Sequence, residues 1–144
     1  MELGLPCKND KCFVTSVNNM FHVNKQNVPR RERKGLISHF LFGQKEVSDT
    51  RLSITWVEVV PRARQQSHHH APEQVYIIVR GQGRMQVGAE EQIVAPGDLV
   101  YIPPHVEHGI INVQDEPLVY ISAATPAFDH AELYDQGQLR PENY

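Results

Sequence analysis

The sequence lacks several features that would assign it to a specialised class of protein. It has only two cysteines in 144 residues, and its longest apolar stretch, around Val75–Val79, is far too short to span a bilayer. Cys7 and Cys12 are interpreted as ordinary thiols, because a chain of this size has little need of a disulfide. No charged leader followed by an apolar segment is visible, so we expect no signal peptide and predict a soluble, cytoplasmic protein.

A strong excess of one charge is also missing. Lys and Arg number 14 against 17 Asp and Glu, which gives a formal net charge of −3. Non-specific binding to phosphates needs a broad positive field, so we expect neither a nucleic-acid nor a membrane partner. One stretch is sharply charged, RRERK at residues 30–34. It either steers an anionic ligand or acidic partner, or is a solvated loop after Pro29.

Helical periodicity is absent before residue 128. In that part of the chain, apolar residues do not recur at the spacing of a helix face. Short β-rich runs instead alternate with Gly and Pro at intervals of roughly 8–12 residues, which is typical of an all-β sandwich or closed barrel. A helical turn or two is predicted only over residues 129–134. The predicted strands are Cys12–Val17, Leu36–Phe42, Arg51–Val60, Gln74–Arg80, Gly83–Val87, Gln92–Val94, Leu99–Ile102, His108–Val113 and Leu118–Ala123.

The connections between these runs carry turn residues. Residues 88–91 (GAEE) predict a tight hairpin connection, and residues 95–98 (APGD) predict a type II turn. We expect one domain, with an N-terminal arm over 1–35, a β-barrel over 36–125 and a C-terminal tail over 126–144. The strands Arg51–Val60 and Gln74–Arg80 are apolar on both faces, so a second sheet or a second subunit is expected to cover the outer one.

Histidine is over-represented, with eight in the chain, and five of these fall within 41 residues. Because alternate residues of a strand share a face, His68 and His70 point the same way, and Gln74 and Tyr76 continue that face. His108 on a later strand can meet them. Imidazole nitrogens and an amide oxygen are a plausible ligand set for a divalent transition metal. The alternative is that these histidines are surface or core residues, since H-x-H alone is a weak signal.

The spacing of two segments favours the metal. Residues 68–81 read H-x-H-x3-Q-x6-G, residues 97–112 read G-x5-P-x-H-x2-H-x3-N, and 15 residues separate Gly81 from Gly97. These segments resemble the two signature motifs of the cupin superfamily, as found in small single-domain (type-2) cupins. The resemblance implies a jelly-roll β-barrel with one divalent metal, Fe, Mn, Ni or Zn, near one end. By position, it implies that His68, His70, Gln74 and His108 are the metal ligands.

The chain departs from the family pattern at three positions. Gln74 stands where the family has a glutamate ligand, Pro61 where the first motif begins with glycine, and His105 where the second motif has glycine. A neutral amide leaves the full +2 charge on a bound metal, which makes it a stronger Lewis acid and favours anionic oxygen ligands. Glu73 alternates away from the site, unless an irregular turn at Pro72 exchanges it with Gln74.

Two residues are candidates for catalysis around the metal. The Tyr76 hydroxyl either orients a substrate or shuttles a proton, or it belongs to a core aromatic with a satisfied hydroxyl. Glu58 is a buried candidate base with a raised pKa if its face of the strand lines the barrel. If that face is outside, Glu58 is solvated and Thr55 lines the barrel. His39 is a candidate pocket residue, and Asn112 is expected to bond a neighbouring backbone.

These features predict a metal-dependent protein that binds an oxygen-rich small-molecule substrate. Its chemistry is either non-redox Lewis-acid catalysis, as in an isomerase, lyase or cyclase, or O2-dependent oxidation, because the ligand types fit both. The alternative is a non-catalytic sensor or carrier in which the metal anchors the ligand. The resemblance and the doubly apolar strands further predict a homodimer.

Overall fold

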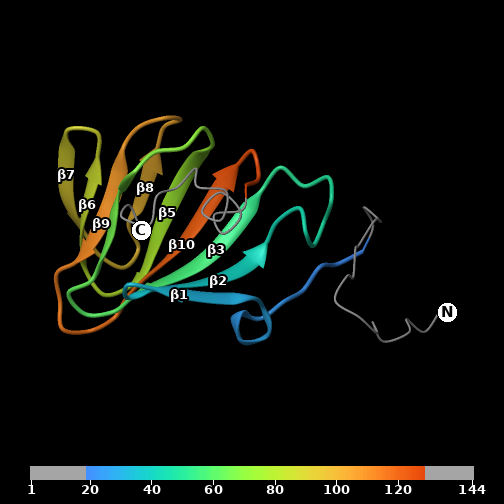
Figure 1. The fold of residues 1–144 in the computed structure, drawn as a ribbon, viewed down its shortest axis with the longest axis horizontal. Helices are drawn as coiled ribbons and strands as arrows, with labels where there is room; N and C mark the ends of the chain where they lie inside the picture. Colours follow the sequence, from blue (N-terminus) through green and yellow to red (C-terminus); the bar gives the residue numbers. More distant parts are fainter. Residues whose placement is uncertain (1–18, 129–144) are drawn as a thin grey trace.

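The computed structural model describes residues 19–128, which form two antiparallel β-sheets packed against each other (Figure 1). The 3-10 turn η1 (Lys25–Asn27) precedes the first strand. The larger sheet has the order β1 (Arg30–Arg33), β2 (Leu36–Phe42), β3 (Ser53–Val59), β10 (Leu118–Thr125), β5 (Glu73–Arg80) and β8 (Leu99–Ile102). The smaller sheet has the order β4 (Arg64–His68), β9 (His108–Asn112), β6 (Gly83–Val87) and β7 (Glu90–Val94). The predicted all-β jelly-roll class is confirmed.

Most of the predicted strands are present. The bounds of β2, β6 and β8 agree with the prediction, while β3 is shorter than Arg51–Val60 and β7 begins earlier, at Glu90. The prediction of a loop for the charged stretch is wrong: residues 30–33 form β1, which pairs with β2. β4 was not among the predicted strands, because its sequence RQQSH has no apolar alternation. No helix in residues 19–128 is long and apolar enough to cross a membrane.

Some sequence predictions lie outside the described residues. These are the strand Cys12–Val17, the two cysteines and the helical turns over residues 129–134.

The turns follow from a few special residues. The β6–β7 hairpin uses two residues, Gly88 and Ala89, rather than the four predicted, because Glu90 and Glu91 already belong to β7. The predicted turn at residues 95–98 is confirmed: Gly97 has φ +95, and the Asp98 N–H donates to the Ala95 carbonyl at 3.0 Å. That φ is the one that a type II turn requires at its third residue.

Two left-handed residues stand where the family motifs have glycine. His105 has φ 62, as expected for that position. The first motif needs a correction: counted back from His68 its glycine position is Arg62 rather than Pro61, and Arg62 has φ 65. Gly81 is retained, with φ 76, and a Cβ there would lie 2.5 Å from the Pro117 carbonyl oxygen. The chain thus keeps the turn geometry of both motifs while replacing two of their glycines.

The interior between the sheets has an apolar and a polar part. Strand alternation directs Val57, Val59, Tyr76 and Ile78 inward, as the period-2 pattern requires. The apolar core consists of Leu36, Val57, Val59, Tyr76, Ile78, Met85, Val94, Ile102, Ile110, Leu118 and Tyr120. The buried polar side chains are Thr55, Gln65, His68, His70, Gln74, His108, Asn112 and Ser122. A buried polar group is costly without a partner, so this second set marks the candidate site.

Candidate metal centre

Strand pairing brings three of the predicted ligands together. His68 ends β4, and His108 begins β9 directly opposite it in the register. His70 follows two residues after β4, and its carbonyl accepts a 2.8 Å hydrogen bond from the N–H of His105. All three rings are buried, and one nitrogen from each lies within 4.8 Å of the others. This is a group that could hold a metal ion.

Close approach of the backbones makes this convergence possible. Gly109 follows His108, and a Cβ at Gly109 would lie 2.9 Å from the Gln65 carbonyl oxygen on β4. The β4–β9 register also shifts between Gln65 and His68. The irregular pairing and the absent side chain let the two histidine-bearing strands approach each other, so the rings of His68 and His108 lie 4.3 Å apart between centroids.

Hydrogen bonds to the backbone fix the same tautomer in all three rings. The Nδ1 atoms of His68, His70 and His108 lie 2.9 Å from the carbonyl oxygens of Gln66, Pro72 and Val106 respectively. A carbonyl oxygen only accepts, so each Nδ1 carries the proton and each neutral ring has its lone pair on Nε2. Metal-binding histidines in proteins use this arrangement, in which the second ring nitrogen donates to a carbonyl or carboxylate.

Burial keeps these rings neutral. Desolvation lowers the pKa of His68 to about 4, with a smaller contribution from the neighbouring His70. Desolvation, followed by the nearby His68, lowers the pKa of His108 to about 3, and burial also lowers the pKa of His70. Neutral imidazole is the form that binds a metal, so the site is ready for one at neutral pH.

Gln74 completes the group from β5. Its Oε1 lies 3.0 Å from Nε2 of His70, and its Nε2 donates to the Ser122 hydroxyl. Because His70 is neutral and protonated on Nδ1, its Nε2 carries a lone pair. This lone pair faces a lone pair of the Gln74 oxygen Oε1. The Nε2 of His108 is buried and has no hydrogen-bond partner among residues 19–128. Lone pairs directed into one small space are the pattern that a cation would satisfy, so the residues fit a divalent metal.

Glu73 points out of the barrel. Its carboxylate accepts a 2.7 Å hydrogen bond from the exposed hydroxyl of Tyr101, whereas Gln74 is almost completely buried. The alternation expected from the sequence therefore holds through Pro72.

Tyr76 lies on the inward face, as expected, next to the histidines. Its ring is 6.1 Å from that of His108 and stacks on Tyr120 at 4.3 Å. Its hydroxyl donates to Gln65 at 2.8 Å, and burial raises its pKa. The hydroxyl is therefore held as a neutral donor and is part of the core.

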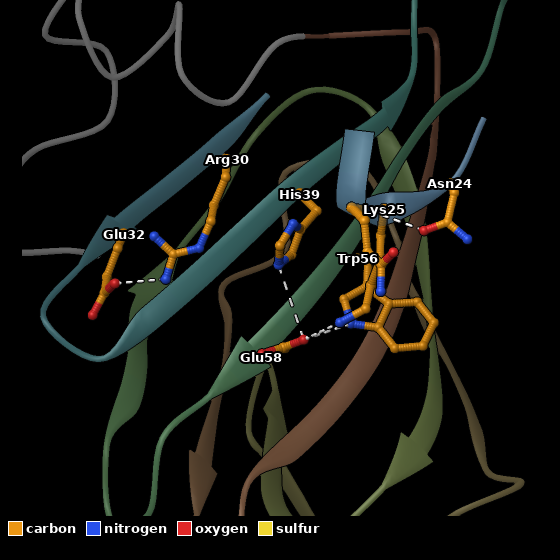
Figure 2. Close-up of polar contacts among 8 residues, drawn as sticks. Asn24, Lys25, Arg30, Glu32, His39, Trp56 and Glu58 are labelled. Atoms are coloured by element: carbon orange, nitrogen blue, oxygen red, sulfur yellow. Dashed lines mark hydrogen bonds and ion pairs between the residues drawn. The ribbon is translucent and has the colours of Figure 1, made fainter. Parts of the chain in front are cut away.

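Glu58 alternates along β3 with the buried residues Val57 and Val59, so it lies on the outer face of the larger sheet. His39 lies beside it there (Figure 2). The expectation that Glu58 lines the barrel is wrong; Thr55 does so instead. Glu58 accepts hydrogen bonds from Lys25 at 2.8 Å and from Trp56 at 3.1 Å. Burial raises the pKa of the Glu58 carboxyl, but the hydrogen bonds and the Lys25 charge outweigh it, so the pKa is lowered rather than raised.

His39 is likewise not a pocket residue. Its Nε2 lies 3.9 Å from the Glu58 carboxylate, while its neighbours on β2, Ser38 and Phe40, face the interior. The parity of β2 explains the error, since the sequence does not say which face of an apolar strand is buried.

Two residues of the interior were missed. Gln65 accepts from Tyr76, and Ser122 accepts from Gln74. Both line a small cavity of about 10 Å³, together with Leu36, Ser38, Phe40, Thr55, Val57, Tyr76 and Tyr120. That volume has room for about one water. Alternation along the last strand could have placed Ser122 with Tyr120, but no signal pointed to Gln65. Asn112 is structural, as expected: its amide donates to the carbonyls of Val59 and Glu116.

Comparison with known proteins agrees with the fold. The sequence model of the cupin domain family matches residues 55–124. A cupin-like protein from Thermotoga maritima is 30% identical, with a TM-score of 0.58 over 63% of this chain and 68% of that one. The chain belongs to the cupin superfamily.

Two further structures share the fold at lower identity. An RmlC-like cupin from Shewanella frigidimarina is 19% identical, with a TM-score of 0.66 over 81% of this chain and 97% of that one. A predicted oxalate decarboxylase from Thermotoga maritima is 13% identical, with a TM-score of 0.67 over 74% and 99%.

The curated relatives have different activities. The glucose-6-phosphate isomerase of Pyrococcus furiosus is 29% identical over 80 residues, which are 49% of this chain and 42% of that protein. The acireductone dioxygenase of Bacillus pumilus is 26% identical over 77 residues, 50% and 44% of the two chains. The chain spans about half the length of the curated relatives that it matches.

Proposed function

We propose that the protein is a metal-dependent cupin that acts on an oxygen-rich small molecule. One observation carries this proposal: three buried imidazoles, all protonated on Nδ1, converge with the amide oxygen of Gln74. His68, His70, His108 and Gln74 would hold one divalent transition metal, Fe, Mn, Ni or Zn. A metal held there supplies a Lewis acid or, in the case of iron, a centre for reaction with dioxygen.

The neutral ligand set determines which molecules suit the site. Three imidazoles and an amide leave the +2 charge uncompensated, so an anionic ligand with two oxygens, such as an enolate, a keto acid or a carboxylate, is favoured. The Tyr76 hydroxyl, with its raised pKa, stays protonated and holds Gln65 in place. Glu58 has no part in this proposal, because its carboxylate is held by Lys25 on the outer face.

Both reaction classes stay within the proposal. The relatives include an isomerase and a dioxygenase, and the ligand types suit either. The identity of the metal separates them, since reaction with dioxygen needs a redox-active metal.

The test is the metal content of tag-free protein, measured by elemental analysis beside His70→Ala and Gln74→Ala. We expect close to one equivalent in the wild type and a large loss in His70→Ala. Iron would direct a screen to dioxygen uptake with catechols, diketones and thiols. Zinc, nickel or manganese would direct it to isomerase, lyase and cyclase substrates. Protein that stays metal-free after reconstitution would overturn the proposal.

The second candidate is a non-catalytic binding protein with the metal as anchor. It is favoured by the places of the two catalytic candidates, because the Tyr76 hydroxyl is a core donor to Gln65 and Glu58 is paired with Lys25 on the outer face. Turnover of any substrate in the screen above would exclude it, whereas saturable binding without turnover would support it.

We also propose that a second copy of the chain covers the outer face of the larger sheet. Ile77 and Val79 on β5, and Leu99 and Tyr101 on β8, form an exposed apolar area, and Ile77 pairs with Leu99 in the register. Large exposed apolar areas mark interaction surfaces. Light scattering should give twice the monomer mass, and Leu99→Glu should give the monomer. A cytoplasmic location stays a prediction.

A further inference from the structure

One aromatic side chain from beyond the last strand lies against the histidine cluster. Phe128 comes three residues after the end of β10, and its ring centroid is 4.8 Å from that of His70. We propose that Phe128 is a specificity-determining residue that forms the end wall of the metal centre and limits the size of the ligand. This inference rests on the proposed function and deepens it, because it names the ligand as a small anion such as a short keto acid.

Contacts with both sheets hold Phe128 in this place. Its N–H donates to the Ser53 hydroxyl at 3.5 Å, and Ser53 begins β3 in the larger sheet. Ser53 pairs with Ala124 of β10, which in turn stands opposite Gln74. The Phe128 ring lies against His70, which follows β4 of the smaller sheet, at a separation typical of aromatic contacts. Phe128 therefore bridges the two sheets at the end of the barrel that carries the metal centre.

The inner side of the histidine cluster is closed by packed aromatic side chains. The ring of Tyr76 lies 6.1 Å from that of His108, between centroids, and stacks on Tyr120 at 4.3 Å. Its hydroxyl is held by Gln65 at 2.8 Å. The cavity among these residues measures about 10 Å³, which is room for about one water. A ligand bound at the histidines therefore has no space for a substituent on this side.

The flanks of the cluster are closed by strand pairing. His68 and His108 stand opposite each other where β4 pairs with β9, and Gln74 lies on β5 between β10 and β8. Paired strands are roughly 4.8 Å apart, which leaves no gap for a substituent. The burial of the cluster agrees, since none of its three histidines is more than 7% exposed. Any part of a ligand beyond its metal-binding oxygens must therefore extend toward Phe128.

The Phe128 ring then decides which substituents fit. A short group ends before the ring, whereas a bulky group needs the space that the ring occupies beside His70. Differences of a single methylene in such a pocket change binding by roughly 10–200-fold, so an aromatic ring in the wrong place excludes a large ligand. Removal of the ring would open an apolar space that a larger substituent can fill.

The test compares pyruvate with phenylpyruvate, which share the keto-acid group and differ by one phenyl ring. Each is titrated into Co²⁺-loaded protein, and the visible absorption of Co²⁺ gives the dissociation constant. We expect the wild type to bind pyruvate about tenfold more tightly or better, and Phe128→Ala to shift the ratio of the two constants toward phenylpyruvate by about tenfold or more. Phe128→Leu keeps an apolar group of similar reach and should keep most of the discrimination.

The matched control is Phe42→Ala, which removes a different phenyl ring from the same end of the barrel. Phe42 contacts Phe21 at 5.4 Å between centroids and pairs with Ile54, whose side chain alternates with that of the inward-facing Thr55. This variant should leave the ratio of the two dissociation constants within about threefold of the wild type. Comparing the two keto acids within each variant removes any general change in metal affinity or stability from the result.

A measurement without metal tests the position of the ring itself. In metal-free protein, the ring current of Phe128 should shift the NMR signals of the His70 ring protons. Phe128→Ala and Phe128→Leu should both abolish this shift, while Phe42→Ala should preserve it. Unchanged His70 signals in Phe128→Ala would show that the ring does not lie against His70 and would overturn the inference.

The outcomes separate this inference from the proposed function. Wild-type protein that binds no Co²⁺ would overturn the metal centre and, with it, the role of Phe128. Protein that binds Co²⁺ but neither keto acid, in the wild type and in Phe128→Ala, would overturn the role of Phe128 and leave the metal centre intact. The same conclusion would follow from an unchanged ratio of the two dissociation constants in Phe128→Ala.

Discussion

The larger sheet has a histidine cluster near its inner face and another histidine on its outer face, and their chemistry differs. Inside, the three histidines His68, His70 and His108 lie close together, and each donates a hydrogen bond from Nδ1 to a backbone carbonyl. Outside, His39 lies 3.9 Å from the Glu58 carboxylate, which also binds Lys25 (Figure 2). The inner group is built from neutral side chains and the outer one around charges.

The difference shows what prepares a histidine for a metal. A carboxylate beside an imidazole favours the protonated ring, whereas burial among neutral groups favours the neutral ring. Burial lowers the pKa of His68 to about 4 and that of His108 to about 3, so these rings are neutral. The outer carboxylate already has a lysine as its cation. Histidine content alone therefore does not make a metal site. The groups around each ring decide whether it is neutral and able to bind a metal.

The largest expected effect comes from removing one inner ring. His108→Ala should reduce Co²⁺ or Zn²⁺ affinity by more than about 100-fold, because it removes a ligand that no nearby side chain replaces. His39→Ala removes a histidine from the outer face and should leave the metal stoichiometry unchanged. Elemental analysis after dialysis against a defined metal buffer compares the two. Equal metal loss in both variants would show that the inner rings are not a distinct site.

Acid should destabilise the metal-free protein through the inner rings. Their pKa is lowered from 6.5 in the unfolded chain to about 4 for His68 and about 3 for His108. The unfolded state therefore binds more protons, and the stabilisation is complete above pH 6.5 and is lost as the pH falls toward these values. At pH 5 the loss is on the order of 2 kcal/mol per ring.

Urea unfolding of chelator-treated protein at pH 7 and pH 5 measures this loss. His108→Asn should reduce the difference between the two pH values, while His39→Ala should keep it. A free energy of unfolding that stays flat between pH 7 and pH 5 would contradict the assignment of neutral buried rings.

Introducing a carboxylate into the inner group makes it resemble the outer one. Gln74→Glu places a negative charge against the imidazoles, which should raise the apparent pKa of His70 and strengthen metal binding by about tenfold, since an opposite charge favours a bound cation. In the metal-free protein the same change should lower stability, because a buried carboxylate is costly to desolvate. Competition titration measures the change in metal affinity, and urea unfolding measures the change in stability. Weaker metal binding in Gln74→Glu would contradict the role of residue 74 as a ligand.

The sequence predicted the inner group better than the outer one, for a physical reason. Motif spacing and strand parity placed His68, His70, Gln74 and His108 together, because the period of a strand fixes which residues share a face. Parity does not say which face of a strand is buried when both faces are apolar. The sequence therefore could not decide whether Glu58 and His39 lie inside or outside the barrel. The strand of Ser122 was predicted, but its bond to Gln74 depends on the pairing of β10 with β5. β4 and β1 were missed because tertiary pairing overrides their polar sequences.

The smallest expected effect comes from breaking the outer cluster. Glu58→Gln removes the charge that binds Lys25, and because this pair is partly exposed, the cost in stability should be about 0.5–1 kcal/mol. Trp56 is the single tryptophan of the chain, and its Nε1 donates to Glu58 while Lys25 lies over its ring at 5.1 Å. Its fluorescence should therefore change in Glu58→Gln, while Co²⁺ affinity stays at the wild-type value. Loss of metal together with the fluorescence change would mean that the two faces of the sheet are coupled, and that the charged cluster helps to hold the strands that carry the site.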